Sequence, residues 1–234
     1  MNIKKIILLP LLFIASLSSA FAEGEKGDPE QLYKYQFGLD FDIKLAKGLK
    51  LEVGPELRYC EGFDKFLLNG GLSYKVIDNL YIGASYRLIV DRGESTSTSS
   101  FNSFGGYSSG SNYDYDTYHR FAFDATYKDK FGRFTPSFRV RCNNYSDDDA
   151  GSEAYLRYRA KVEYDIRKCV ITPFLYAEAF QQLEDSALYK MRYSTGFDLK
   201  TGDNSALEFG YKFDYFLLKY KNAHIFSIGF KQKF

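Results

Sequence analysis

Eleven segments of the chain alternate apolar and polar residues with a period of two, and none of their apolar-side positions holds Asp, Glu, Lys or Arg. The plainest segment runs from Tyr33 to Leu45. A period of two is that of a β-strand. With 26% of the chain charged, only a hydrocarbon environment excludes charge so uniformly, because an outward Lys or Arg at the bilayer midplane costs a barrel about 2 to 4 kcal/mol. The pattern predicts an all-β protein, a transmembrane antiparallel up-and-down β-barrel.

The expected strands are mostly 9 to 13 residues long, which is the length of a tilted strand that crosses a bilayer. They cover residues 33–45, 49–59, 66–76, 80–90, 118–127, 134–142, 154–164, 170–181, 188–199, 206–216 and 223–234. Tight connections alternate with longer ones, of which only 91–117 is truly long. In such barrels the tight turns are periplasmic and the longer loops are extracellular.

The strand count conflicts with this orientation, because bacterial single-chain barrels nearly always have an even number of strands. Residues 23–30 could run up the lumen, since eight extended residues reach roughly 26 Å, or they could add a weak twelfth strand. Alternatively, two of the eleven segments merge. We therefore expect 10 to 12 strands, with ten or twelve preferred.

The ends of the chain predict its destination. Met1 to Ala22 has two lysines, an apolar run and a small-residue ending, as in a secretory signal peptide. The predicted organisation is a signal peptide over 1–22, a periplasmic or lumenal leader over 23–30 and an outer-membrane barrel over 31–234. The last strand ends on Phe234, which resembles the signal read by the barrel-assembly machinery. We expect the protein in the outer membrane of a Gram-negative cell, in contact with lipid and lipopolysaccharide.

The second half of the chain carries a series of short patterns in a characteristic order. They are Tyr118-His119-Arg120, Phe138-Arg139-Val140-Arg141, Leu156-Arg157-Tyr158-Arg159, Pro173-Phe174 with Glu178, Met191-Arg192-Tyr193 before Gly196, and His224-Ile225-Phe226. From Tyr118 onward the chain resembles the uncharacterised outer-membrane family labelled domain of unknown function 2490. That resemblance implies an outer-membrane barrel and no established activity or site.

The polar faces of the later strands are rich in charge, with more basic than acidic residues. A hairpin register that sets Glu178 across from Arg157, and near Lys190 or Arg192, predicts a cross-strand ion network, since buried carboxylates need partners. The residues expected to line the interior are Arg139, Arg141, Arg157, Arg159, Glu178 and Arg192.

Two functions fit this interior. The network can close the lumen as the polar core of a structural barrel, or the basic excess can concentrate small anionic solutes in a narrow channel. Barrel width leaves both open, since eight strands leave room only for side chains whereas sixteen or more leave an aqueous pore. A third possibility is a surface barrel that acts through its extracellular loops on lipopolysaccharide, cations or a partner, through the Ser-, Gly- and Tyr-rich loop 91–117 and Asp147 to Asp149.

Other classes of function have little support. Without Lys4 and Lys5 the net charge is near −1, so no nucleic-acid partner is expected. Cys60, Cys142 and Cys169 are expected to be free, and no Cys or His pair has metal-ligand spacing, so no metal or cofactor is predicted. His119 and His224 lie near the outer rim, as in outer-membrane hydrolases, but neither belongs to a His-x-Ser pair. We expect no catalytic residues and no enzyme, with a rim-located hydrolase as the least favoured alternative.

Overall fold

The computed structural model describes residues 30–60, 63–92, 96–101, 107–112, 115–144, 154–184, 186–217 and 221–234. The predicted signal peptide and nearly all of the leader lie outside these residues. Within the described ranges, no helix is long and apolar enough to cross a membrane. The strands are β1 (Glu30–Ala46), β2 (Leu49–Tyr59), β3 (Phe63–Ile77), β4 (Leu80–Arg92), β5 (Thr96–Phe101), β6 (Tyr107–Asn112), β7 (Tyr115–Lys128), β8 (Phe134–Asn143), β9 (Tyr155–Tyr164), β10 (Ile171–Gln182), β11 (Leu188–Lys200), β12 (Ser205–Phe216) and β13 (Lys221–Lys233).

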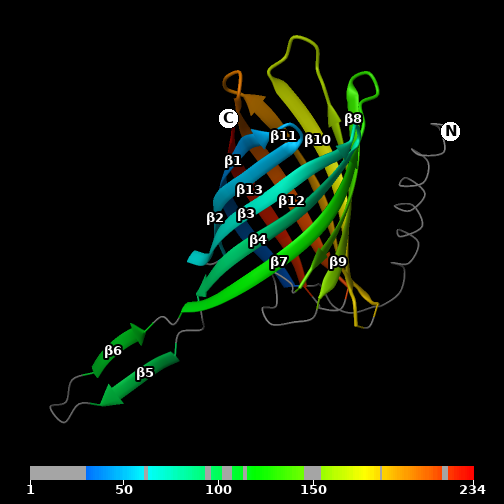
Figure 1. The fold of residues 1–234 in the computed structure, drawn as a ribbon. Helices are drawn as coiled ribbons and strands as arrows, with labels where there is room; N and C mark the ends of the chain where they lie inside the picture. Colours follow the sequence, from blue (N-terminus) through cyan, green and yellow to red (C-terminus); the bar gives the residue numbers. More distant parts are fainter. Residues whose placement is uncertain are drawn as a thin grey trace.

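Eleven of these strands form one closed barrel, in the order β1-β13-β12-β11-β10-β9-β8-β7-β4-β3-β2 (Figure 1). All neighbours pair antiparallel except β1 and β13, which run parallel from Glu30 beside Lys221 to Asp42 beside Lys233. The all-β barrel with ten to twelve strands is confirmed. The preferred count of ten or twelve is wrong for the described barrel, because β1 and β13 close eleven strands with a parallel pair and no two predicted strands merge. The leader that could have added a strand lies almost wholly outside the described residues.

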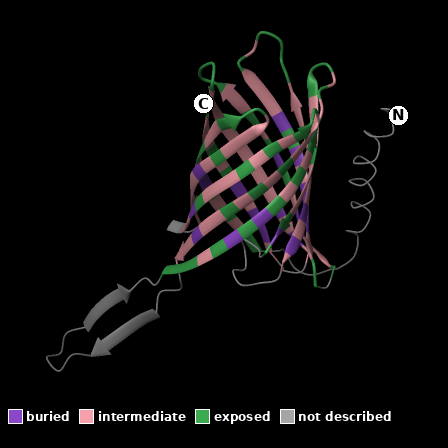
Figure 2. Cartoon of the chain, viewed as in Figure 1, coloured by how far each residue is buried: buried purple, intermediate pink, exposed green. Residues whose placement is uncertain are grey.

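The predicted division into two faces is also confirmed. On β1, Tyr35 and Phe37 are exposed on the outer wall, whereas Gln36 between them is buried in the lumen. The same alternation runs over the barrel as diagonal bands of exposed and less exposed residues (Figure 2). A period-two pattern folded into a closed sheet therefore gives an apolar exterior and a polar interior.

The two ends of the barrel differ. The short-turn rim carries the connections at 47–48, 78–79, 129–133, 165–170 and 201–204, together with Phe234, and lies at the top of Figure 1. Gly48 and Gly132 adopt φ values of 82° and 63° in two of these turns, a region that glycine enters without steric penalty. The loop rim carries the two longest connections, 93–114 and 144–154, together with three short ones and the start of β1.

The longest predicted loop contains structure that its composition did not indicate. Residues 96–101 and 107–112 pair as the antiparallel hairpin β5-β6, in a two-stranded sheet separate from the barrel. Strands β4 and β7 also extend beyond their predicted ends and stay paired as far as Arg92 and Tyr115. The segment 91–117 is therefore partly β-structure rather than a simple flexible loop.

Candidate functional site

The lumen holds one carboxylate surrounded by four arginines. Glu178 of β10 has a side chain with no exposed surface, and its carboxylate accepts hydrogen bonds from Arg157 Nε at 3.2 Å and Nη2 at 2.9 Å. Arg159 Nε also donates to Oε1. Arg139 Nη2 lies 3.5 Å from Oε1 and Arg192 Nη1 lies 3.9 Å from Oε2. Four consecutive strands of the barrel, β8 to β11, thus supply one ion network.

Between β9 and β10 the register differs from the expected one by two residues, whereas on β11 the partner of Glu178 is one of the two expected. Glu178 pairs with Arg159 on β9 and with Arg192 on β11, while Arg157 pairs with Phe180. Because a shift of two keeps every side chain on its face, Arg157 still points into the lumen and reaches Glu178 diagonally. The predicted network exists with a different direct partner.

A second carboxylate extends the network. Asp214 of β12 accepts two hydrogen bonds from Arg192, at 2.5 and 2.6 Å, and Lys190 Nζ lies 3.4 Å away. Both Asp214 and Lys190 are about 98% buried as side chains. Lys190 also sits 4.2 Å from the ring centroid of Phe180, with the Arg157 guanidinium 4.9 Å from the same centroid. Aromatic faces favour such cations when water is excluded.

All six residues predicted to line the interior do face it. Four of them, Arg139, Arg157, Arg159 and Arg192, surround the fifth, Glu178. Arg141 instead binds Asp124 of β7, with Nε at 3.0 Å and Nη2 at 2.5 Å from Oδ1.

The opposite wall carries a smaller set of charges that the sequence reasoning did not single out. Arg58 Nε donates to Glu56 at 2.7 Å, and Arg87 Nη2 lies 3.8 Å from the other oxygen of that carboxylate. Arg87 also donates to Asn69. These residues follow the same alternation as those of the later strands. The period-two pattern therefore predicts that they face the lumen, but it does not predict which of them pair.

Near the loop rim a ring of buried side chains crosses the lumen face of nine strands. We call this ring the collar. From β3 round to β13 it consists of Leu67, Ile89, Arg120, Asn143, Tyr155, Phe180, Lys190, Phe216 and Ala223, each no more than 7% exposed. Arg120 lies 3.5 Å from the Tyr155 hydroxyl, and the rings of Tyr155 and Phe180 stack with centroids 6.2 Å apart. Burial of this extent around the ring indicates that side chains fill the lumen at this level.

Toward the short-turn rim the lumen is more exposed and its charges are mixed. Glu163 binds Lys161 at 2.8 Å and Lys128 at 3.0 Å, while Lys231 binds Asp198 at 3.1 Å and also Glu208. Lys128 itself is exposed. We call this open half the vestibule. Its positive and negative groups nearly balance, so the basic excess is concentrated between the vestibule and the collar.

The two histidines face outward near the loop rim. His119 Nδ1 lies 2.7 Å from the Tyr86 hydroxyl, and His224 Nδ1 lies 2.7 Å from the Tyr211 hydroxyl, with Gln31 Oε1 2.9 Å from its Nε2. No disulfide joins Cys60, Cys142 and Cys169. In the described ranges no three His, Cys, Asp or Glu side chains gather closely enough to hold a metal ion. Asp147 to Asp149, considered for cation binding, lie outside those ranges.

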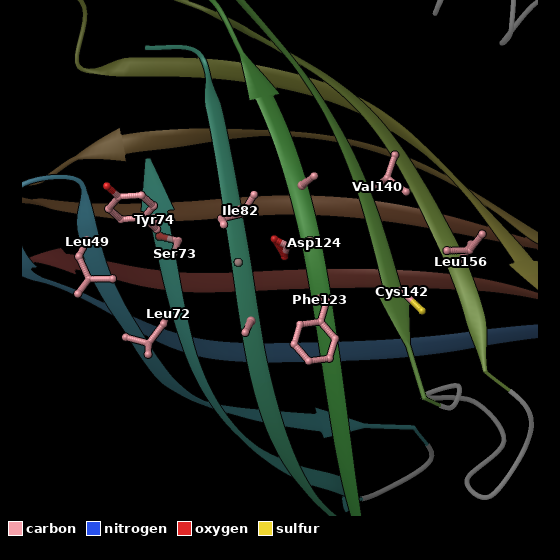
Figure 3. Close-up of a pocket in the computed structure, with 13 residues that line it drawn as sticks. Leu49, Leu72, Ser73, Tyr74, Ile82, Phe123, Asp124, Val140, Cys142 and Leu156 are labelled. Carbon is pink, nitrogen blue, oxygen red and sulfur yellow. The ribbon is translucent and has the colours of Figure 1, made fainter. Parts of the chain in front are cut away.

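The outer wall contains two shallow apolar grooves. The larger, of about 540 Å³, lies over Gly83, Ala84 and Ala125, where small residues leave a hollow between Tyr74 and Phe123 (Figure 3). The other, of about 500 Å³, lies over Gly196, Gly210 and Ser227. Both grooves are lined mainly by apolar side chains, so they suit contact with hydrocarbon rather than catalysis or the binding of a polar ligand.

Comparison with known proteins identifies a family and no activity. No curated protein and no solved structure matches the chain. The model of one family, described as "Protein of unknown function (DUF2490)", matches residues 30–222, which include all the barrel strands except most of β13. That match covers most of the chain and includes the patterns from Tyr118 to Gly196, although not His224-Ile225-Phe226, so the chain belongs to this family of unknown function.

Proposed function

We propose that the protein is an integral β-barrel of the Gram-negative outer membrane, exported by its signal peptide. The apolar outer wall supports this, because residues such as Phe37, Leu72 and Phe123 are 44%, 47% and 67% exposed and would be covered by lipid and lipopolysaccharide. Exposed apolar surface of this extent is unfavourable in water. Phe234, at the short-turn rim, would be read by the barrel-assembly machinery during insertion.

The lumen, in this proposal, is closed at the loop rim and open at the short-turn rim. The collar carries this conclusion, because its aromatic and charged side chains are almost wholly buried and pair with one another. Such a barrel does not conduct constitutively. It acts through its loops and its vestibule, on lipopolysaccharide, cations or a partner, and no enzymatic reaction is part of the proposal.

The second candidate function is a narrow passage for anions, and the basic excess favours it. From the collar to the edge of the vestibule, basic side chains of the described residues outnumber acidic ones: Arg58, Arg87, Arg120, Arg139, Arg141, Arg157, Arg159, Lys190, Arg192 and Lys212 stand against Glu56, Asp124, Glu178 and Asp214. In a low-dielectric tube this excess attracts anions. The two candidates differ in whether the collar blocks the path.

Planar-bilayer recording of the refolded mature protein separates the two candidates. The closed barrel predicts silence for the wild type and steady, anion-selective steps for Tyr155→Ala combined with Phe180→Ala, because removing both rings opens the collar. Phe197→Ala with Phe209→Ala is the matched control, since it removes a stacked pair from the outer wall, with centroids 5.2 Å apart, and should stay silent. Folding of each variant is checked by heat-modifiable migration on gels. Ohmic, anion-selective steps from the wild type would establish the passage instead.

A further inference from the structure

The network around Glu178 has more donors than its carboxylates can accept. Five cationic side chains, Arg139, Arg157, Arg159, Lys190 and Arg192, share the two carboxylates of Glu178 and Asp214. A guanidinium has five N–H donors, whereas a carboxylate offers about four acceptor sites. Arg139 has the weakest pairing: among the described residues its one contact with an acid is Nη2 at 3.5 Å from Glu178, and its buried Nε has no hydrogen-bond partner there.

The surplus charge is accessible from the vestibule. Arg139 and Arg159 are direct partners on β8 and β9, and their side chains are 19% and 25% exposed, against 0% for Glu178. They lie one step farther from the collar than Arg141 and Arg157. Like charges placed directly opposite each other are destabilising, so a pair of this kind is stabilised by an additional anion on its open side.

We propose that Arg139 and Arg159 form a binding site in the lumen for the phosphate group of a small solute. The planar fork of a guanidinium matches phosphate oxygens with two parallel hydrogen bonds, and two adjacent forks can hold one tetrahedral group. A dianion compensates more of the surplus positive charge than chloride or a single carboxylate does. The solute enters through the vestibule, because the collar closes the other end, so the inference deepens the closed barrel proposed above.

Isothermal titration of the detergent-refolded mature protein with inorganic phosphate tests the site. The titration is made at constant ionic strength with chloride as the reference anion. The wild type should bind phosphate saturably, and Arg139→Gln should weaken binding about tenfold or more, since one charge-assisted contact is lost. Arg133→Gln is the matched control: this arginine is exposed at the short-turn rim, where it donates to the Tyr164 hydroxyl at 3.3 Å, and phosphate affinity should not change.

A second variant keeps the test decisive if Arg139→Gln does not fold. Arg159→Lys retains the charge but removes the fork, and it should also weaken phosphate binding while migrating as a folded barrel. Absence of saturable phosphate heat in the wild type, or equal affinity in both lumen variants and the control, overturns the site. Conductance is measured separately and tests the closed lumen. If the barrel does not conduct and does not bind phosphate, only the phosphate site is wrong. If it conducts and binds phosphate, only the closed lumen is wrong.

Discussion

At the scale of single residues, Glu178 is the side chain on which the lumen network depends. Glu178→Gln removes the shared negative charge and leaves four guanidiniums without a carboxylate between them. We therefore expect the free energy of unfolding to fall by about 3 to 5 kcal/mol, as when one partner of a buried ion pair is removed. Urea unfolding of the refolded barrel measures this loss. Glu163→Gln is the control, because that carboxylate is 22% exposed between two vestibule lysines, and it should change stability by about 1 kcal/mol or less. Equal losses in the two variants would contradict the assigned role of Glu178.

Also at this scale, the sequence predicted which residues face the lumen but not how they pair. The period-two alternation determines that Glu178 and Arg157 face the lumen, because a shift of register by two residues leaves each side chain on the same face of the sheet. The direct pairing depends on the turn at 165–170, where Lys168 adopts a positive φ of 54°, and no pattern in the strands encodes that geometry. Arg120 and Asn143 were missed for a related reason: their burial arises from the collar, whose members lie far apart in the sequence.

At the scale of elements, the parallel pairing of β1 with β13 is the feature that closes the barrel. Gly38 and Gly229 are direct partners on the lumen face, and a Cβ at either position would meet no atom closer than 3.7 Å. In a background with its three native cysteines replaced, Gly38→Cys with Gly229→Cys should therefore form a disulfide, since paired strands place Cα atoms within bridging distance. Non-reducing gels of the unfolded protein detect the cross-link. The shifted pair Gly38→Cys with Ser227→Cys is the control, and cross-linking to the same extent there would rule out this register.

The elements themselves could largely be predicted, since every barrel strand lies within a few residues of its expected range. The way the barrel closes could not be predicted. Alternation shows which face of a strand is apolar, but it does not show that the first and last strands pair with each other in parallel. Hairpin β5-β6 was missed because its sequence, such as Thr96 to Phe101, is dominated by Ser and Thr without an apolar face. A segment without alternating apolar residues gives no periodic signal.

At the scale of the whole molecule, the two rims differ enough to define an orientation. Phe234 and connections that are all short share one rim, whereas the other rim carries the two longest connections, 93–114 and 144–154, as in barrels whose short turns are periplasmic and whose long loops are extracellular. The vestibule would then open to the periplasm, and the collar would seal the lumen toward the outside. A phosphate-bearing solute would reach Arg139 and Arg159 from the periplasmic side.

This orientation predicts different accessibility for two inserted epitope tags. A tag between β5 and β6 should be labelled by antibody on intact cells, whereas a tag in the turn at 201–204 should be labelled only after the outer membrane is permeabilised. Both tagged proteins must appear in the outer-membrane fraction with heat-modifiable migration, which controls for misfolding at the insertion sites. Labelling of the 201–204 tag alone on intact cells would invert the orientation and place the mouth of the vestibule outside. Recovery of both proteins in the soluble periplasmic fraction would contradict the proposal that lipid covers the apolar outer wall.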